Sequence, residues 1–420
     1  MSAFQAPTGT RDVLPPESAR FSAVVARFAE LAGRFGYGLL VSPMFEDAQV
    51  FRRSAGDSTD IVQKEMYEFE DKGGRTLALR PEGTASVVRA FLQHHPQVPW
   101  KVWYATPAFR YERPQAGRYR QHHQLGTEAI GTADPDLDVE VISLGASFLA
   151  SLGLTGITLQ VNSMGDDACL PGYRAALTGY LAAHESGLCA EHAKRWSANP
   201  LRVLDCKDPA CVALHAGAPL LSEALCESCR AHFARVTEGL DAAGLVWTRD
   251  EFLVRGFDYY NRTTFEFAAP ALAGAQDVVL GGGRYDKLVA ALGGDPTPGI
   301  GFGCGIERVL LAADAEGALL SPGGGVDVFV VDLVGGAAAR DLAERLRRSG
   351  IATDRAFDGR SLKAQLRVAD RSHARLAAIV GAAELAAGDV TLRVLRGEGA
   401  GSQETVETAA LEGAIQRWIT

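Results

Sequence analysis

A chain of 420 residues is long enough for two or three domains, each with its own core. Its hydrophobic content of 47% and charged content of 22% are ordinary for a soluble globular protein, and its net charge of −9 gives no sign of a nucleic-acid binder, although a whole-chain sum hides a local basic face. No apolar run approaches the length of a membrane span, and the first residues lack the apolar core of a signal peptide. We therefore expect a cytoplasmic protein without membrane contact, whose seven cysteines are thiols or metal ligands rather than disulfides.

The first 80 residues predict a helix, a strand and a hairpin. Residues 19–35 carry apolar side chains at helical spacing, with Ser18 as the expected cap. Residues 39–43 predict a short strand that ends at Pro43. A Gly-Gly pair between two β-prone runs predicts a hairpin over 64–80.

The block RPEGT at 80–84 opens a predicted helix that continues to Phe91. Glu82 and Thr84 fall at its start, where carboxylates and hydroxyls are favoured because the first N–H groups of a helix lack partners. A structural cap is one interpretation of this pair. The other places Glu82 against the ammonium group of a substrate.

Residues 102–131 predict two strands joined by a polar loop that is rich in arginine. Guanidinium groups bind phosphate oxygens in pairs, so this loop is either a solvated hairpin tip or a site for a triphosphate or a nucleic-acid stem. Arg110 and Glu112 flank Tyr111 and are expected to share one face of a strand.

The composition changes in the middle of the chain. Residues 134–153 predict a helix with acidic residues in its first turn, and 156–166 predicts a strand. Residues 167–235 are rich in alanine, helical in pattern, and contain most of the cysteines. We interpret them as a helical insertion in a domain whose strands resume over 245–312.

Residues 251–267 combine Arg255, Tyr259 and Tyr260 with an alternation that is typical of a strand, and a glycine-rich segment follows at 280–286. A cation and two phenols at the mouth of a strand predict a polar pocket for a small ligand, and tyrosines packed on the sheet are the alternative. Neighbouring residues of a regular strand face opposite ways, so both tyrosines can line a pocket only where the backbone is irregular.

Residues 298–312 alternate glycine with apolar residues and then pass into a predicted helix. Glycine is normally poor in strands, and four glycines on one face, Gly303 among them, would leave a bare backbone surface that suits a planar base. Arg308 at the start of the helix would then lie over that surface.

Together these segments resemble the histidyl-tRNA synthetase family of the class II aminoacyl-tRNA synthetases. The resemblance rests on RGFDYYNRT, GGGRYDKL and three further blocks in the order of the class II motifs 1, 2 and 3. It implies an α+β protein with a class II antiparallel-sheet catalytic domain over 1–320, interrupted by the helical insertion at 167–235. A linker at 321–326 and a C-terminal α/β anticodon-binding domain over 327–420 would complete the chain.

The resemblance also implies an activity, histidine–tRNA ligase. Such an enzyme activates L-histidine with ATP and Mg²⁺ to histidyl-adenylate and pyrophosphate, and then transfers histidine to the 3′ end of tRNA(His). The catalytic residues would be Arg255, Arg110 and Arg308. The histidine-binding residues would be Glu82, Gly83, Thr84, Gln124, Glu128, Arg255, Tyr259 and Tyr260. The ATP-binding residues would be Arg110, Glu112, Arg118, His122, Gly303 and Arg308.

Further expectations follow from the same resemblance. His122 stands where the family's motif 2 has a phenylalanine against adenine, and imidazole offers less stacking surface. Gln115 would meet the extra 5′ guanosine of the tRNA. The helix and strand of motif 1 would form a homodimer.

Two questions stay open at the level of sequence. One set of cysteines has the count and spacing of a zinc site, and free buried thiols are the alternative. The cysteines of that set are Cys206, Cys211, Cys226 and Cys229. The same fold also serves as a non-catalytic, histidine-binding regulatory subunit of ATP phosphoribosyltransferase, which generally lacks the C-terminal domain and parts of the signature that this chain carries.

Overall fold

The computed structural model describes residues 4–56, 59, 61–257, 259–272, 277–318, 325–335 and 337–419. The chain forms two compact units, Met1–Ser321 and Pro322–Thr420. Four residues of the expected linker, 321–324, lie outside the described residues. None of the helices in the described ranges is long and apolar enough to cross a membrane.

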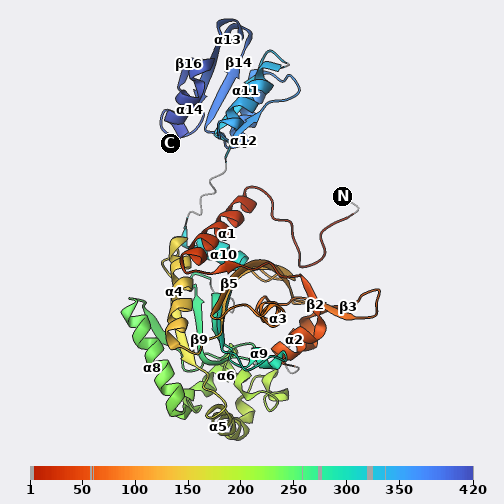
Figure 1. Ribbon diagram of the computed structural model, residues 1–420, viewed down its shortest axis with the longest axis vertical. Helices are drawn as coiled ribbons and strands as arrows, with labels where there is room; N and C mark the ends of the chain where they lie inside the picture. The colour runs from red at the N-terminus through yellow and green to blue at the C-terminus, as the bar shows by residue number, and fades with distance from the viewer. Residues whose placement is uncertain are drawn as a thin grey trace. The chain divides into compact units, whose positions relative to one another are not determined.

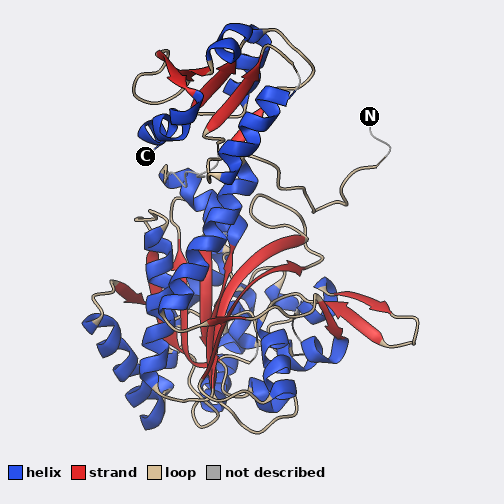
Figure 2. Cartoon of the chain, turned by 45° about the horizontal axis from the view of Figure 1, so that its top comes forward, coloured by secondary structure: helices blue, strands red, loops and turns tan. Residues whose placement is uncertain are grey.

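An eight-stranded sheet is the frame of the first unit, in the order β1-β5-β6-β11-β10-β9-β7-β8 (Figures 1 and 2). The pairings from β5 through β7 are antiparallel, and the edge strands β1 and β8 pair in parallel. The strands are β1 (Gly38–Leu39), β5 (Trp100–Phe109), β6 (Gln121–Ile130), β7 (Thr158–Ser163), β8 (Trp247–Arg249), β9 (Asn261–Ala268), β10 (Val278–Arg284) and β11 (Gly299–Gly305).

Different helices cover the two faces of this sheet (Figure 1). One face packs against α1 (Glu17–Arg34), α4 (Pro135–Ser151), α8 (Glu227–Ala242) and α10 (Ile306–Glu316) through one apolar core. The strands contribute alternate residues to this core, such as Phe265 and Phe267 of β9 and Ile300 and Phe302 of β11. α3 (Thr84–His94) and α9 (Leu288–Ala291) cover the other face. The alternation predicted for β9 and β11 is therefore the alternation between these two faces.

The predicted N-terminal elements are present with shifted ends. α1 begins at Glu17 after Pro16, so Ser18 lies inside the helix and does not cap it. The strand expected at 39–43 has only the two residues of β1, because the chain then bends to bring the carbonyls of Ser42 and Pro43 to the Arg80 guanidinium. The predicted hairpin is β3 (Tyr67–Glu70) and β4 (Thr76–Leu79). It is preceded by β2 (Phe45–Asp47), which also pairs with β4, by α2 (Ala48–Ala55) and by a π-turn at Ile61–Glu65.

The segment between β7 and α8 is an insertion with a small core of its own. Its elements are short: α5 (Leu170–Ala183), α6 (Pro209–Leu214), α7 (Leu221–Ala224) and 3₁₀ turns at Glu185–Gly187, His192–Lys194, Pro200–Val203 and His215–Gly217. Residue 235, the expected end of the insertion, lies inside α8. Phe233, Val236 and Leu240 of that helix pack into the main core, so α8 belongs to the sheet that it covers.

The second unit is a five-stranded sheet in the order β13-β12-β14-β15-β16, with its own two cores. Its strands are β12 (Val328–Asp332), β13 (Thr353–Arg355), β14 (Leu376–Val380), β15 (Asp389–Val394) and β16 (Gln403–Glu407). Its helices are α11 (Ala337–Arg348), α12 (Leu362–Arg371), α13 (Ala382–Ala387) and α14 (Leu411–Ile419), with a 3₁₀ turn at Thr408–Ala410. Strands and helices alternate through most of this unit, as expected of an α/β domain.

A buried ion pair joins β10 to α4. Arg284 and Asp138 are both 0% exposed, and Arg284 Nε donates to Asp138 Oδ1 at 3.0 Å. The same guanidinium donates to the carbonyl oxygen of Asp134 at 3.1 Å. His232 Nε2 lies 2.8 Å from Asp138 Oδ2, and the Thr263 hydroxyl donates to the same oxygen. Burial alone would raise the pKa of Asp138, but the bonds from His232 and Arg284 hold it below its usual value.

We expect Asp138→Asn to destabilise the first unit by about 3–5 kcal/mol, because it removes the closer and fully buried carboxylate from Arg284 and leaves only the longer contact with Asp286 at 3.3 Å. Urea unfolding of the full chain, followed by tryptophan fluorescence, measures this change. The matched control is Asp136→Asn on the same helix, where the ion pair with Arg235 is more than half exposed and should change the midpoint little. Equal midpoint shifts in the two variants would contradict the role of the buried pair.

Candidate active site

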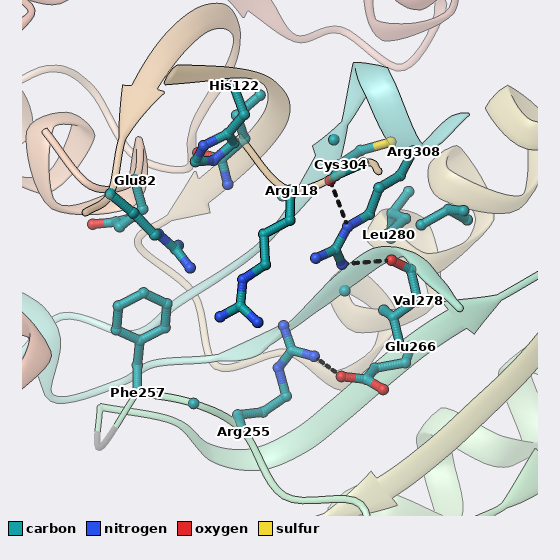
Figure 3. Close-up of a pocket in the computed structure, with 18 of the residues that line it drawn as sticks. Glu82, Arg118, His122, Arg255, Phe257, Glu266, Val278, Leu280, Cys304 and Arg308 are labelled. Carbon is teal, nitrogen blue, oxygen red and sulfur yellow. Dashed lines mark hydrogen bonds and ion pairs between the residues drawn. The ribbon is translucent and has the colours of Figure 1, made fainter. Parts of the chain in front are cut away.

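A cavity of about 400 Å³ lies against β6, β10 and β11 in the first unit (Figure 3). It brings together most of the site residues expected from the sequence: Glu82, Thr84, Arg110, Glu112, Arg118, His122, Gln124, Arg255, Tyr259, Tyr260, Gly303 and Arg308. Gly83, Gln115 and Glu128 do not line it. Of the signature RGFDYYNRT, Asp258 lies outside the described residues.

Arg255 reaches into the cavity from the irregular segment before β9 (Figure 3). Its guanidinium pairs with Glu266 of β9, lies 5.4 Å from the centre of the Tyr260 ring, and is 15% exposed. A Cβ on Gly281 would stand 2.6 Å from Arg255 Nη1. The absence of a side chain on Gly281 therefore leaves the space in which this cation lies, and a larger residue would displace the guanidinium from its present position.

Three more guanidinium groups face the same space. Arg110 Nε donates to the carbonyl oxygen of Pro81 at 2.9 Å, and Arg308 Nη1 donates to that of Val278 at 2.9 Å. Burial lowers the pKa of Arg110, Arg118 and Arg308, and for Arg308 the charges of the other two arginines add to this effect. Cations that are held together and away from water create a strong preference for an anionic ligand.

The expected strand-face pairing of Arg110 and Glu112 is wrong. β5 ends at Phe109, and the Glu112 N–H donates to the Arg110 carbonyl at 2.8 Å, so the two residues lie in a turn. Arg110 Nη1 remains 4.0 Å from Glu112 Oε1, whereas Glu112 makes a close ion pair with Arg118. The turn directs the Glu112 carboxylate to Arg118, and the ion pair holds that guanidinium in place.

Glu82 caps α3 and also lines the cavity. Its carboxylate accepts hydrogen bonds from the N–H groups of Thr84 and, at 2.8 Å, Ala85. Burial raises its pKa, although these bonds act in the opposite direction. Gly83 contributes its backbone, because its N–H donates to Gln124 Oε1 at 3.0 Å and holds that amide at the cavity wall. Both interpretations of the RPEGT block, cap and ligand contact, are thus compatible with one geometry.

Glu128 lies beneath the cavity and is 0% exposed. The Thr84 hydroxyl donates to its Oε1 at 2.6 Å, and the Tyr285 hydroxyl donates to its Oε2 at 2.6 Å. The Tyr104 hydroxyl is 3.3 Å from Oε1. Burial raises the pKa of Glu128 to about 8, so the carboxyl retains its proton near neutral pH. Thr84 stands between this acid and the ligand space.

Tyr259 and Tyr260 both line the cavity, as the sequence predicted for an irregular backbone. They precede the first residue of β9, and their ring centres are 4.5 Å apart. Phe257 stacks on Tyr259 with a centre distance of 5.0 Å and an interplanar angle of 12°. These three aromatic rings lie beside the arginines, because Arg110 is 5.8 Å from the centre of the Phe257 ring and Arg255 is 5.4 Å from that of Tyr260.

Comparison with known proteins gives the family. The family model described as histidyl-tRNA synthetase matches residues 9–309, and an anticodon-binding domain matches residues 327–418. The histidine–tRNA ligases of Moorella thermoacetica and Rhodococcus erythropolis are each 48% identical over 410 residues, which is 96% of this chain and 96% of each relative. The apo histidyl-tRNA synthetase of S. aureus is 34% identical, with a TM-score of 0.80 over 99% of both chains.

The chain belongs to the histidyl-tRNA synthetase family. The resemblance drawn from the sequence is confirmed, as is the α+β fold with a C-terminal anticodon-binding domain.

The glycine-bearing face of β11 is not the bare surface expected of a synthetase adenine site. A Cβ on Gly301 would overlap Glu128 Oε2, and one on Gly303 would overlap Gln124 Nε2. Gly301 and Glu128 are directly opposite on neighbouring strands, which explains the close approach. The glycines make room for side chains of β6, and only Gly303 and Gly305 of the four reach the cavity.

His122 and Gln115, the two residues assigned to ATP and tRNA through the family, lie in different surroundings. His122 of β6 lines the cavity, and its burial beside Arg110 and Arg308 lowers its pKa to about 3. Its imidazole therefore stays neutral and can stack as an uncharged ring. Gln115 is exposed in the loop between β5 and β6, where its backbone pairs with Arg118.

The four cysteines grouped from sequence spacing do not form one cluster. Cys206 and Cys211 lie with Cys189 and His192, whereas Cys226 and Cys229 lie with Asp166 and Cys169. The fold brings residues at the start of the insertion, just after β7, next to residues at its end, and cysteines that are neighbours in sequence therefore separate. Among the described residues, His192 is the histidine that these two groups contain.

Sequence reasoning missed several residues of the cavity wall. Glu266 occupies a polar position in the alternation of β9, which was the signal in the sequence. In the structure it forms an ion pair with Arg255 and holds that guanidinium in the cavity. Phe257 is aromatic like Tyr259 and Tyr260, and this similarity was the signal that could have identified it. Asp205 and Lys207 come from the insertion, and no pattern marked them.

The raised pKa of Glu128 predicts a pH-dependent stability. The unfolded chain loses this proton near pH 4.5 and the folded chain near pH 8, so stability should fall as pH rises between these values and level off above 8. Glu128→Gln mimics the neutral acid and should lack this loss, which is at most on the order of 5 kcal/mol.

Urea unfolding of both proteins at pH 5, 6.5 and 8 gives the comparison. The original chain should lose stability relative to the Glu128→Gln variant as pH rises, so the difference between the two should change steadily across this range. The control is Glu238→Gln, which removes an exposed carboxyl on α8 and should show no such trend. A constant difference between the original chain and Glu128→Gln would contradict the buried acid.

Proposed function

We propose that the chain is a cytoplasmic histidine–tRNA ligase, which activates L-histidine with ATP and transfers it to tRNA(His). The observation that carries the proposal is the meeting of Arg110, Arg118, Arg255 and Arg308 in one cavity of about 400 Å³. Two anions, a carboxylate and a triphosphate, must come together for this reaction. A buried group of cations lowers the cost of that approach.

In the first step a carboxylate oxygen of histidine bonds to the α-phosphorus of ATP. The bond from that phosphorus to the oxygen bridging to the β-phosphate breaks, and pyrophosphate leaves with the electron pair. Charge on the phosphoryl oxygens is highest during this exchange. In this proposal Arg255, which pairs with Glu266 and lies beside Tyr260, binds the carboxylate and the α-phosphate, and Arg110 and Arg308 bind the phosphate chain. The presence of all three arginines in the lining of one cavity supports these roles.

Mg²⁺ fits the same cavity. Glu112 and Asp277 supply carboxylate oxygens on a wall that also carries Arg118 and Arg308. Hard oxygen donors together with substrate phosphates are the ligands that Mg²⁺ takes. When bound with ATP the ion would neutralise part of the pyrophosphate charge.

Histidine selection is assigned to the acidic, amide and aromatic side chains of the same cavity. Glu82, Thr84 and Gln124 lie where they can hold the amino group, and Tyr259 and Tyr260 lie beside the space for the ring. Glu128 would accept a bond from an imidazole N–H once the Thr84 hydroxyl turns aside. A site built to bond both ring nitrogens rejects apolar analogues by roughly 10⁴–10⁵.

Two surfaces support the macromolecular contacts. In the second unit, α12 borders a groove of about 880 Å³ whose basic residues suit RNA phosphates: Arg360, Lys363, Arg367, Arg371 and Arg393. In the first unit, four large apolar residues near the edge strand β1 are more than half exposed: Leu39, Val41, Met44 and Phe45. Exposed apolar groups at a sheet edge support a homodimer through motif 1. Gln115, exposed in the arginine-rich loop, remains our candidate contact for the 5′ guanosine.

The alternative is a non-catalytic, histidine-binding regulatory subunit. A Bacillus halodurans chain described as an ATP phosphoribosyltransferase regulatory subunit/histidyl-tRNA synthetase shares the fold, with a TM-score of 0.64 and 22% identity. The complete set of arginines and the match to an anticodon-binding domain over 327–418 favour the ligase.

We expect Arg255→Ala to lower histidine-dependent ATP–pyrophosphate exchange by about 10²–10³, because it removes a cation from the charge that develops in the transition state. Histidine binding, measured by calorimetry, should remain detectable. The control is Arg249→Ala, which removes an arginine that pairs with Glu251 outside the cavity. Exchange at the original rate in the Arg255 variant would contradict the assignment.

Removal of residues 322–420 should leave ATP–pyrophosphate exchange largely intact and greatly reduce aminoacylation of tRNA. The physical reason is that the apolar cores of the two units share no residues, so the first unit keeps its own core. Parallel assays of exchange and of tRNA charging separate the two effects. Equal losses in both assays would show that the second unit serves the cavity rather than the tRNA.

A further inference from the structure

Six of the seven cysteines gather in two clusters in and beside the insertion. The members of the first, which we call the insertion cluster, are Cys189, His192, Cys206 and Cys211. The members of the second, the junction cluster, are Asp166, Cys169, Cys226 and Cys229. In each cluster the four candidate ligand atoms lie within 4.8 Å of one another. All these cysteines are free thiols.

The insertion cluster has the dimensions of a tetrahedral zinc site. Cys189 Sγ lies 3.9 Å from Cys206 Sγ and 3.3 Å from His192 Nδ1, and Cys211 Sγ lies 3.8 Å from the same nitrogen. A tetrahedron with zinc–sulfur bonds of about 2.3 Å and zinc–nitrogen bonds of about 2.0 Å has edges of roughly 3.5–3.8 Å. One ion at the centre would reach all four atoms with little movement.

The junction cluster has the same dimensions with an oxygen in place of the nitrogen. Cys169 Sγ lies 3.9 Å from Cys229 Sγ and 3.6 Å from Asp166 Oδ1, and Cys226 Sγ lies 3.7 Å from that oxygen. Arg262 Nη2 is 3.5 Å from the other oxygen of Asp166, which compensates for the extra negative charge of this ligand set. The separation of the sulfurs is far from the roughly 2.05 Å of a disulfide.

Spacing and backbone bonds agree with this geometry. Three ligand pairs have two residues between their members, the x₂ pattern of structural zinc sites: Cys189 and His192, Asp166 and Cys169, and Cys226 and Cys229. The Cys189 N–H points at Cys211 Sγ at 3.4 Å, and the Asp166 N–H points at Cys169 Sγ at 3.2 Å. Backbone donors of this kind stabilise thiolates that bind a metal.

The insertion also needs a constraint that its regular structure does not supply. Between the end of α5 and the start of α6, residues 184–208 contain only short 3₁₀ turns. A segment of that length without helix or strand loses much conformational entropy when it becomes ordered. The insertion cluster joins Cys189, His192 and Cys206 of this region to Cys211 of α6. The junction cluster joins the start of the insertion after β7 to its end at the start of α8.

We propose that the chain binds two structural zinc ions, one in the insertion cluster and one in the junction cluster. Each ion has four protein ligands, so neither offers an open position for catalysis. A Cys₃His set and a Cys₃Asp set at these distances favour zinc, because soft thiolates in a small tetrahedron suit that ion.

The first ion would also support the wall of the cavity. Its ligand Cys206 lies between Asp205 and Lys207, both of which line the cavity. Arg202, four residues earlier in the chain, donates to the carbonyl oxygen of Gly256, beside Arg255. The metal would therefore fix the part of the insertion that faces the substrates, without touching them.

The test is the zinc content of the full-length protein, produced in zinc-supplemented medium without a histidine tag and measured by inductively coupled plasma mass spectrometry. We expect two zinc ions per chain. His192→Gln should lower the content to one, and so should Cys229→Ser. The matched control is His184→Gln, which alters a histidine of the same insertion that lies in neither cluster and should keep two ions.

Each other outcome overturns part or all of the proposal. A protein without zinc overturns both sites, and a content that His192→Gln or Cys229→Ser leaves unchanged overturns the site that contains that residue. A fall in the His184 control would show that the metal is held by unspecific contacts.

A second measurement uses the unaltered protein, in case a variant does not fold. Titration of its thiols with a mercurial reagent in the presence of a zinc indicator should release two equivalents of zinc. After chelation, trypsin should cut the insertion at Lys194 and Arg195, and added zinc should protect these bonds. Cleavage that zinc does not alter would contradict a structural role for the metal.

Discussion

The ion pair between Arg284 and Asp138 ties the signature segment of β10 to the helix layer behind the sheet. Both side chains are inaccessible to water, and the guanidinium also holds the backbone at the start of α4. The next two residues, Tyr285 and Asp286, connect the same segment to the site through hydrogen bonds. The Tyr285 hydroxyl donates to Glu128, and the Asp286 carboxylate accepts a bond from Asn261 Nδ2 at 2.9 Å. One short stretch thus positions the sheet, the buried acid and the start of β9.

The cations of the cavity and the buried acid beneath it occupy different positions. Arginines occupy the side where phosphate is expected, and each has a backbone or carboxylate anchor. The acid Glu128 is buried beneath hydroxyl groups, and its burial raises its pKa. A carboxyl with a raised pKa opposes the field of the arginines less than an ordinary carboxylate would, so the arginines and the acid can serve different parts of one reaction.

Local pattern was sufficient for most of the fold. The alternation in β9 and β11, the Gly-Gly hairpin and the arginine-rich loop all report on neighbours in sequence, and the structure contains these elements. Local pattern did not predict contacts between residues that are far apart in the sequence. The partner of a β11 glycine is a side chain of β6, far earlier in the chain, and sequence gives no measure of that approach.

The same limit explains the errors at the site. Cys206, Cys211, Cys226 and Cys229 were grouped because they are close in sequence. The fold instead joins the first two to Cys189 and His192, and the last two to Asp166 and Cys169 at the start of the insertion. The end of the insertion was misplaced because α8 has an alanine-rich composition like its neighbours, and only its packing on the sheet shows where it belongs. Asp205 and Lys207 face the cavity because of the path of an irregular loop, which has no periodic signal.

The glycines of β11 have a consequence for attempts to redesign the specificity of this enzyme. Gly301 and Glu128 share one volume, since a methyl group on the first would overlap the carboxylate of the second. The same methyl group would also overlap the carbonyl oxygen of Thr127, which belongs to the backbone and cannot turn aside. A smaller residue at 128 would therefore not make room for a side chain at 301. An engineer who wants the pocket to accept another amino acid can vary position 128 but must leave glycine at 301.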